Sequence, residues 1–267
     1  MSTTAEDTDA FLSMRAVGKT FRQRRRAIHA LDSIDLDVTR GEFVSLLGPS
    51  GCGKSTLLRI IGGLVEADVG EVSVDGLLPR AARAAKQYGL VPQSPALVPW
   101  KTLSQNVRFL TTLRSGAETH ATMTDAEIDD LLRTVGLDGF ERAYPHELSG
   151  GMQQRASLVR AFALGAPILL MDEPFAALDE ITRADMRYLL LELWGRHTTT
   201  VVFVTHSITE AAILSDRVVV MAARPGRMVA SRVIDLPRPR TPDMEDDPAF
   251  HEHVRILRAT LREHHVR

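Results

Sequence analysis

The 267-residue sequence contains one cysteine, Cys52, few aromatic residues (5%) and no long apolar run. A single cysteine excludes an intramolecular disulfide, so the main sequence sign of an oxidising compartment is missing. No apolar stretch approaches the roughly 18 residues that a membrane-spanning helix needs. The first residues, MSTTAEDTDA, lack the basic and apolar regions of a secretory signal. We therefore expect a cytosolic protein that acts at a membrane only through partners.

A strong charge bias of either sign is also absent. The 32 Lys and Arg residues nearly balance the 34 Asp and Glu residues, which leaves a net charge of -2. This balance gives no overall attraction to nucleic acid or to an anionic membrane surface. The basic run RQRRR, residues 22–26, has no interleaved aromatic residues, and we interpret it as a solvated hairpin tip rather than a nucleic-acid or lipid patch. We predict no nucleic-acid partner.

Two kinds of strand pattern are present. Residues 34–38 alternate apolar and acidic side chains, and Val72 and Val74 repeat the alternation before Asp75 and Gly76. This pattern predicts an antiparallel sheet with one solvated face. Four later segments are almost continuously apolar, which is typical of parallel strands covered on both faces: FVSLL, ILLM, VVFVT and RVVVM. The sequence therefore predicts an α/β fold.

Helical patterns lie between these strands. Thr124-x-x-Glu127 forms a capping box ahead of an apolar face that ends at Gly136. We expect a helical insertion here, over residues 100–144.

Further helix signals follow in the second half of the chain. One helix is expected to follow Asp179 and to end at Gly195, and the spacing Ser207-x-x-Glu210 caps another. The dipeptide Pro225-Gly226 indicates a tight turn between two strands.

A glycine-rich loop follows the apolar strand FVSLL. The segment GPSGCGKST matches G-x-x-x-x-G-K-[ST] and precedes a helical pattern, which is the strand, loop and helix context that this motif requires. Main-chain N–H groups and the helix N-terminus bind phosphate oxygens, Lys54 reaches the terminal phosphates, and the Ser55 hydroxyl binds Mg²⁺. We expect Cys52 to contribute only its backbone N–H. The predicted nucleotide-binding residues are Gly48, Pro49, Ser50, Gly51, Cys52, Gly53, Lys54, Ser55 and Thr56.

Three other strand-like runs end in polar residues. Asp172 and Glu173 follow ILLM, His206 ends VVFVTH, and Gln93 follows YGLVP. Ligands of an open parallel sheet bind beyond the carboxyl ends of its strands, so we expect these side chains to face the phosphate loop. We assign Glu173 to the attacking water, and His206 and Gln93 to the terminal phosphate or the catalytic geometry. The expected Mg²⁺ ligands are Ser55, Gln93 and Asp172.

A second glycine pair lies in LSGGMQQR, residues 148–155. Ser149 is a good N-cap, and Gly150 and Gly151 open a helix whose N-terminus is a further anion site. Because the first loop already wraps the phosphates, this site is expected to meet the exposed face of a nucleotide. It does so either after closure of a lobe of the same chain or on another molecule, and the residues alone leave both alternatives open.

These motifs occur together in one order: GPSGCGKST, Gln93, LSGGMQQR, ILLMDEP, ALD at 177–179, and His206. In this order they resemble the ATPase subunit of an ATP-binding cassette (ABC) transporter, over most of the chain to about residue 227. The resemblance implies an α/β P-loop cassette with a parallel core sheet, an antiparallel β subdomain and a helical subdomain. It also implies that the chain binds and hydrolyses ATP with Mg²⁺.

The resemblance further implies a head-to-tail homodimer. In such a dimer Ser149, Gly150 and Gly151 of one subunit close over the ATP that the other subunit holds. Asp179 then belongs to the loop that crosses the interface. An aromatic residue before the first core strand stacks on adenine in this family; Phe21 is the candidate, although tyrosine is commoner there, and packing of Phe21 in the core is the alternative.

The same resemblance implies a bacterial importer, peripheral at the cytoplasmic face of the inner membrane. Its partners would be integral membrane permease subunits and, indirectly, a periplasmic or lipid-anchored solute-binding protein. The segments LVPW, MDEPFAALDEITR and ARPGRMV resemble the nitrate, sulfonate and taurine importer group. Trp100, in the apolar loop after Gln93, is either an anchor for the membrane subunit or an internally packed side chain.

We expect three regions along the chain. Residues 1–10 form a disordered tail, and residues 11–235 form the ATPase domain, with its helical subdomain at about 99–165. Residues 236–267 form a helical C-terminal extension, because apolar residues recur there at helical spacing.

Two other classes of protein share part of this motif set. The first is a soluble ABC-type ATPase in nucleic-acid repair or translation. Repair members place a very long coiled coil between the two glycine motifs, whereas about a hundred residues separate them here, and translation members carry two cassettes per chain. The second is a P-loop kinase, which would need neither LSGGMQQR nor His206. The motif set therefore favours the transporter.

Overall fold

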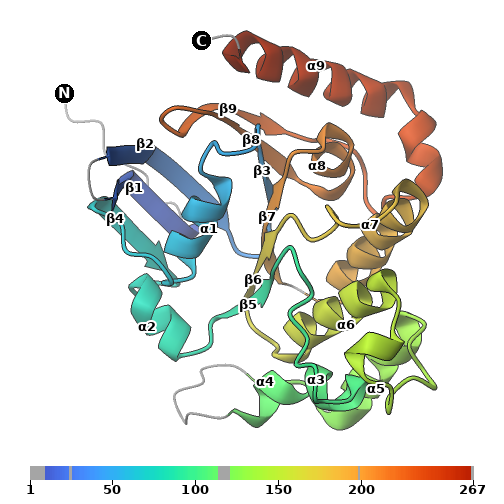
Figure 1. The fold of residues 1–267 in the computed structure, drawn as a ribbon. Coiled ribbons are helices and arrows are strands. Elements are labelled where there is room, and N and C mark those ends of the chain that lie inside the picture. Colours follow the sequence, from blue (N-terminus) through green and yellow to red (C-terminus); the bar gives the residue numbers. More distant parts are fainter. Residues whose placement is uncertain (1–9, 24–25, 114–120, 198, 266–267) are drawn as a thin grey trace.

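The computed structural model describes residues 10–23, 26–113, 121–197 and 199–265 (Figure 1). The tail predicted over residues 1–10 lies outside these ranges except for Ala10, which begins the first strand. Two residues of the basic run, 24 and 25, also lie outside them.

An antiparallel sheet of three strands forms one layer of the fold. Its order is β2-β1-β4, with β1 (Ala10–Gln23), β2 (Arg26–Thr39) and β4 (Val69–Val74). Ile34, Leu36 and Val38 are buried on its inner face, while Asp35 on the other face is exposed. The sheet predicted from this alternation is confirmed.

A sheet of six strands forms the core, in the order β5-β6-β7-β3-β8-β9. Neighbouring strands from β5 to β8 run parallel, and β9 is antiparallel to β8. The strands are β3 (Phe43–Leu47), β5 (Tyr88–Val91), β6 (Ile168–Asp172), β7 (Thr200–Thr205), β8 (Arg217–Ala222) and β9 (Arg227–Val233). Phe43 and Leu47 face one buried apolar cluster, and Val44 and Leu46 face the other. Burial on both faces explains the continuous apolar runs.

Helices cover both faces of the core sheet. In Figure 1, α1 (Lys54–Ile61) and the antiparallel sheet lie on one side, and α6 (Gly150–Ala163), α7 (Glu180–Gly195) and α8 (Ile208–Leu214) lie on the other. The remaining α-helices are α2 (Pro79–Ala84), α3 (Leu103–Val107), α4 (Phe109–Thr112), α5 (Asp125–Thr134) and α9 (Pro248–His265). Two short 3₁₀-helices are η1 (Pro145–Glu147) and η2 (Pro242–Asp246).

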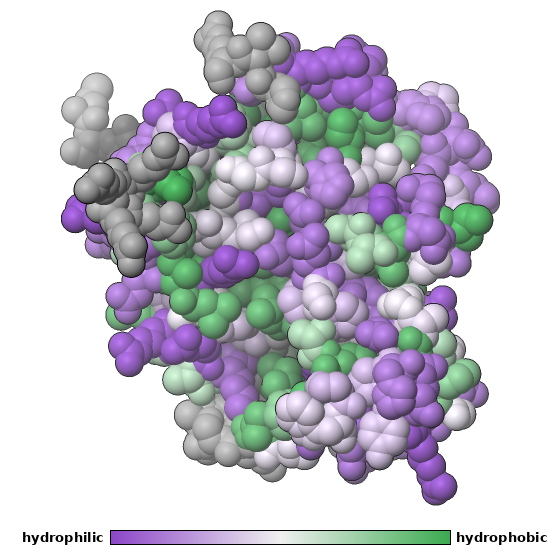
Figure 2. Space-filling model, viewed as in Figure 1, coloured by the Kyte–Doolittle hydropathy of each residue, from purple (hydrophilic) through white to green (hydrophobic). Residues whose placement is uncertain are grey.

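Within the described ranges, no helix has both the length and the apolar character that crossing a membrane requires. On the face shown in Figure 2 hydrophilic residues predominate, and apolar residues form smaller patches between them. The division into an ATPase domain, a helical subdomain and a C-terminal extension stays a prediction.

Of the two helix caps predicted from the sequence, one is formed completely and the other only in part. Thr124 and Glu127 form the complete capping box of α5. Ser207 caps α8, since its Oγ accepts from the backbone N–H of Glu210. The Glu210 side chain, however, does not return to the N-cap as a capping box requires; it accepts the hydroxyl hydrogen bond of Thr205. The expected pairing of Ser207 and Glu210 is therefore only half realised.

Arg240 ties the C-terminal segment to the end of α8. Its guanidinium is buried and donates to the carbonyl oxygens of Ala212, Ile213 and Ser215 at 3.3, 2.8 and 2.7 Å. The last carbonyls of a helix have no partner within the helix, so Arg240 supplies the missing donors. Phe250 of α9 is buried as well, and α9 packs against α8 and β8.

Replacement of Arg240 by alanine should destabilise the fold. The Arg240→Ala change leaves several buried carbonyl groups without a donor, so we expect the free energy of unfolding to fall by about 2–4 kcal/mol. Urea denaturation of the purified chain measures this difference. Arg255→Ala, at an exposed position on α9, is the control and should change the value by less than about 0.5 kcal/mol. Equal effects of the two substitutions would contradict the capping role.

Candidate functional site

The loop of residues 48–53 connects β3 to α1. Gly53 is the N-cap of α1 with φ of 97°, and a Cβ there would lie 2.6 Å from Leu31 Cδ2, so only glycine fits. Lys54 is 4% exposed, and its Nζ donates to the carbonyl oxygens of Gly48 and Pro49 at 2.8 and 3.1 Å. The ammonium group is thus fixed inside the loop, beside the main-chain N–H groups of the helix N-terminus. This arrangement suits phosphate oxygens.

Asp172 and Glu173 lie at the exit of β6 and face this loop. The Ser55 hydroxyl donates to Asp172 Oδ1 at 2.6 Å. Glu173 has φ of 46°, in the left-handed region that glutamate seldom adopts, and this backbone turn lets two consecutive side chains reach one side of the chain. Its Oε1 lies 3.7 Å from Lys54 Nζ, and its Oε2 lies 3.1 Å from His206 Nδ1. One carboxylate therefore stands between the lysine and the histidine.

A cavity of 620 Å³ lies between this cluster and the β1–β2 hairpin. Of the predicted site residues, it is lined by Phe21, Ser50, Gly51, Gly53, Lys54, Ser55, Thr56, Gln93 and Glu173. Asp172 and His206 adjoin it through Ser55 and Glu173. Phe21 is 38% exposed, so it borders the cavity instead of packing in the core.

Gly48, Pro49 and Cys52 do not line the cavity and support the loop from behind. Gly48 and Pro49 accept the hydrogen bonds of Lys54. Cys52 is completely buried, and burial raises the pKa of its thiol. A neutral buried thiol is a poor nucleophile, which agrees with a role for the Cys52 backbone alone.

Sequence analysis missed part of the cavity wall. Ile28 pairs with Phe21 across the hairpin, and Ile28, His29 and Arg224 all line the cavity. Arg224 lies in the β8–β9 turn, far from the hairpin in sequence. The Pro225-Gly226 signal predicted this turn, but it carried no information on where the turn packs.

Gly226 holds the β8–β9 turn against the phosphate loop. Its N–H donates to Ala30 O and its carbonyl accepts from Asp32 N–H, both at 3.0 Å. A Cβ at this position would lie 2.2 Å from Cys52 O and 2.8 Å from Ala30 O. Only glycine therefore allows the turn, the hairpin and the loop to meet.

Ser149, Gly150, Gly151 and Asp179 lie elsewhere, and none of these four lines the cavity. Ser149 caps α6 by accepting from Met152 N–H, and both Ser149 and Gly150 are exposed. Asp179 caps α7 by accepting from the backbone and side chain of Thr182, and these hydrogen bonds lower the pKa of Asp179. A Cβ on Gly151 would lie 3.1 Å from Thr182, so the two helix N-termini are neighbours.

The loop after Gln93 is hydrogen-bonded to α6, and its Trp100 is exposed. Arg160 of α6 donates to the carbonyl oxygens of Pro95 and Ala96, both at 2.8 Å, and is itself buried. Trp100 is 76% exposed. The alternative of an internally packed Trp100 is therefore wrong. The same helix that begins after Ser149 also fixes this loop.

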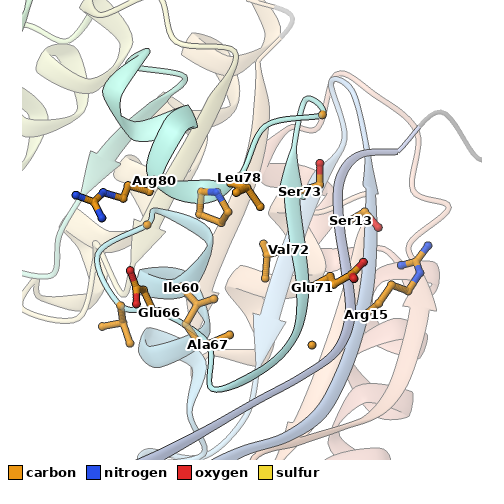
Figure 3. Close-up of a pocket in the computed structure, with 15 residues that line it drawn as sticks. Ser13, Arg15, Ile60, Glu66, Ala67, Glu71, Val72, Ser73, Leu78 and Arg80 are labelled. Atoms are coloured by element: carbon orange, nitrogen blue, oxygen red, sulfur yellow. The ribbon is translucent and has the colours of Figure 1, made fainter.

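A second cavity, of 580 Å³, lies between the end of α1 and β4 (Figure 3). Apolar residues such as Ile60, Val72 and Leu78 line it, together with charged residues of both signs: Arg15, Arg80, Glu66 and Glu71. Its lining lacks Lys54 and the glycine-rich loop, so the first cavity suits phosphate groups better.

Comparisons with known proteins find relatives of this chain. Residues 31–176 match the protein family described as ABC transporter. An uncharacterized ABC transporter ATP-binding protein of Methanocaldococcus jannaschii, MJ0412, is 46% identical over 86% of this chain and 84% of its own length. The aliphatic sulfonates import ATP-binding protein SsuB of Bacillus cereus is 39% identical over 88% of this chain and 90% of its own length.

A solved structure is similar over most of the chain. It is a dimeric, post-hydrolysis state of the ATP-binding cassette MJ0796 bound to ADP and Pi. The TM-score is 0.71 at 33% identity, and the match covers 85% of this chain and 100% of that chain.

The close approach at Gly226 predicts a specific loss of nucleotide affinity. In Gly226→Ala the added methyl group must displace either the β8–β9 turn or the phosphate loop, so we expect the Kd for ATP to rise at least about tenfold. Equilibrium binding of a fluorescent ATP analogue measures this change. Gly195→Ala is the control, because a Cβ there meets nothing within 4 Å. Unchanged affinity in Gly226→Ala would contradict the described packing.

Proposed function

Because the chain belongs to the ABC transporter family, we propose that it is the ATPase subunit of an importer and powers uptake of a small solute through separate membrane subunits. As an ABC ATPase it binds and hydrolyses ATP. The observation that carries ATP hydrolysis is the position of Glu173, which lines the cavity beside Lys54 and lies next to His206. The rival role in nucleic-acid repair or translation finds no support in the relatives reported above.

We assign the chemistry of hydrolysis to three side chains. Lys54 and the main-chain N–H groups of the loop bind the terminal phosphates and stabilise their charge. Glu173 accepts a proton from the attacking water, and its carboxylate is close enough to His206 to be oriented by the ring. His206 donates to the γ-phosphate or to Glu173, and Gln93 completes the cavity on the side of β5. Phe21 and Ile28 form the wall against which the adenine stacks.

Ser55 and Asp172 fit a Mg²⁺ ion bound with the nucleotide. Their oxygen atoms lie 2.6 Å apart, so two hard donors are directed at one position. No group of three or more His, Cys, Asp or Glu side chains suited to a metal occurs in the described part of the chain. Phosphate oxygens and waters would supply the other ligands, as is usual for Mg²⁺, and Gln93 is the third protein candidate. The ion would neutralise phosphate charge.

The role of Glu173 predicts separable effects on binding and hydrolysis. Glu173→Gln keeps the shape of the side chain but removes the base, so ATP binding should persist while phosphate release slows by about 10²–10⁴-fold. A phosphate-release assay and equilibrium ATP binding measure the two quantities. Glu252→Gln on α9 is the control and should leave both unchanged. Normal turnover of Glu173→Gln would rule out the assignment.

We propose a head-to-tail homodimer that completes each nucleotide site. Ser149 and Gly150 are exposed and lie outside the cavity of their own chain, which leaves them accessible to a partner. The N-terminus of α6 favours a negative charge, and an ATP molecule held by the partner presents one. Asp179, beside this helix, would lie at the interface. The dimeric state of the structural relative supports this arrangement.

Action across the interface predicts complementation between two inactive chains. Ser149→Arg places a bulky side chain at the N-terminus of α6, and Lys54→Ala removes the ammonium group from the phosphate loop. Each homodimer should therefore be inactive. A mixed dimer contains one site with both native parts, and we expect phosphate release to recover to a measurable fraction of the wild-type rate. Failure of mixed chains to recover activity would argue for closure within one chain.

We further propose that the subunit is peripheral at the cytoplasmic face of the cell membrane. Its partners would be permease subunits and, indirectly, a solute-binding protein. The exposed Trp100, on a loop that Arg160 holds by two hydrogen bonds, is a suitable anchor for a permease segment, because tryptophans that become buried often dominate binding energy at interfaces. The resemblance to SsuB favours an aliphatic sulfonate as the solute; taurine and nitrate are the other candidates of the same importer group.

Uptake measurements test the importer role. Cells that lack this chain should lose uptake of labelled ethanesulfonate, and the wild-type chain should restore it. With Trp100→Ala the restored uptake rate should be about tenfold lower than with the wild-type chain, because the permease contact is weakened. ATP hydrolysis by the isolated Trp100→Ala chain should be normal. Val233→Ala, at an exposed position on β9, is the control. Unimpaired uptake of every tested solute without this chain would contradict the proposal.

A further inference from the structure

Glu210 is a buried acidic residue to which the proposed hydrolysis assigns no role. It lies in the first turn of α8 and is 5% exposed. Burial raises the pKa of its carboxyl, while the Thr205 hydroxyl and the charge of Arg183 act in the opposite direction. Burial of a carboxylate costs free energy unless the group is paired and hydrogen-bonded. The partners of its two oxygens therefore indicate the role of Glu210.

The first oxygen of Glu210 fixes the turn that carries His206. The Thr205 hydroxyl donates to Glu210 Oε2 at 2.5 Å and accepts from Ser207 N–H at 2.9 Å. Thr205 is buried at the end of β7, directly before His206. These two hydrogen bonds restrain the backbone on both sides of His206. The His206 ring itself is half exposed and approaches Glu173, so its direction depends on this turn.

The second oxygen of Glu210 lies near Arg183 of α7, which in turn holds the segment that ends at Asp179. Glu210 Oε1 lies 3.9 Å from Arg183 Nε, a buried atom without a hydrogen-bond partner. The same guanidinium donates through Nη2 to Leu178 O at 2.9 Å. Leu178 precedes Asp179, the residue that we place at the dimer interface. Glu210 and Arg183 thus connect the Asp179 segment with the His206 turn.

We propose that Glu210 is a positioning residue for ATP hydrolysis, which orients His206 through Thr205 and ties the His206 turn to the Asp179 segment through Arg183. The inference rests on the proposed function of the site and deepens it. Glu210 does not touch the nucleotide cavity, so its effect is on turnover and not on nucleotide binding.

Two substitutions of Thr205 test the first link. Thr205→Val keeps the branched shape but removes the hydroxyl, and Thr205→Ser keeps the hydroxyl. We expect kcat to fall on the order of tenfold in Thr205→Val, with KM and the Kd for ATP unchanged, and to remain close to wild type in Thr205→Ser. Equal kcat values for the two variants, or a rise of KM that matches the fall of kcat, would overturn the proposal.

Glu210→Gln and Arg183→Met test the second link. Glutamine keeps an acceptor for Thr205 but loses the attraction to Arg183, and we expect kcat to fall by about threefold to tenfold in each single variant. If the two residues act as one unit, the double variant should be no slower than the slower single variant. Independent, multiplicative losses would contradict the link. These variants also decide the matter if Thr205→Val does not fold.

The orientation of His206 has a readout that does not depend on activity. The full chain contains nine histidines, and ¹⁵N labelling of their rings gives an NMR signal for each, with His206 assigned from the spectrum of His206→Gln. We expect the ring signals of His206 to shift in Thr205→Val and to stay close to wild type in Thr205→Ser, while those of His251 and His253 on α9 stay in place in both. Unshifted His206 signals in Thr205→Val would overturn the proposal.

Failure of this inference is distinguishable from failure of the proposed function. If the wild-type chain does not hydrolyse ATP, the proposed function fails, and the NMR shifts still report on His206. If the wild type hydrolyses ATP and Glu173→Gln does not, but Thr205→Val has normal turnover and an unshifted His206, only the positioning role of Glu210 is wrong.

Discussion

Parallel pairing of β6, β7 and β3 is the constraint on which the site depends. Leu47 pairs with Thr205, and Asp172 pairs with Val204, so the three strands end at one level. Neighbouring strands lie about 4.8 Å apart, which places the residues that follow them within contact distance. The phosphate loop, Glu173 and His206 follow these strand ends. Their convergence is a consequence of strand order and register, and the loops only refine it.

Lys54 and Glu173 form an ion pair at this edge, and Asp172 adds a second carboxylate. Lys54 donates to two loop carbonyls and lies near Glu173, whose other oxygen faces His206. The negative charge of a triphosphate competes with Glu173 for Lys54, because ATP brings several phosphate oxygens into the loop. We infer that nucleotide binding weakens the pairing of Lys54 with the Glu173 carboxylate, so that the phosphate loop and the proposed base share one cation.

The sequence predicted the parts of the site that depend on local pattern. The phosphate loop follows from its strand, loop and helix context, and Asp172, Glu173 and His206 follow from their position after apolar runs. Ile28 and Arg224 were missed, because they reach the cavity through packing of a hairpin and a distant turn. Glu210 has the spacing of a capping box, but its carboxylate accepts from the buried Thr205 hydroxyl and not from the N–H of Ser207. Tertiary contacts of this kind leave no local signature.

The central claim is that two chains enclose ATP between the loop of one and the α6 N-terminus of the other. A crosslinking measurement tests it most directly, in a chain that combines Cys52→Ser, Glu173→Gln, Ser50→Cys and Ser149→Cys. Ser50 lines the cavity and Ser149 does not, so the account predicts that a short thiol crosslinker joins them between chains, and only when ATP is present. A crosslink within one chain, or an ATP-independent yield of crosslinked dimer, would contradict the account.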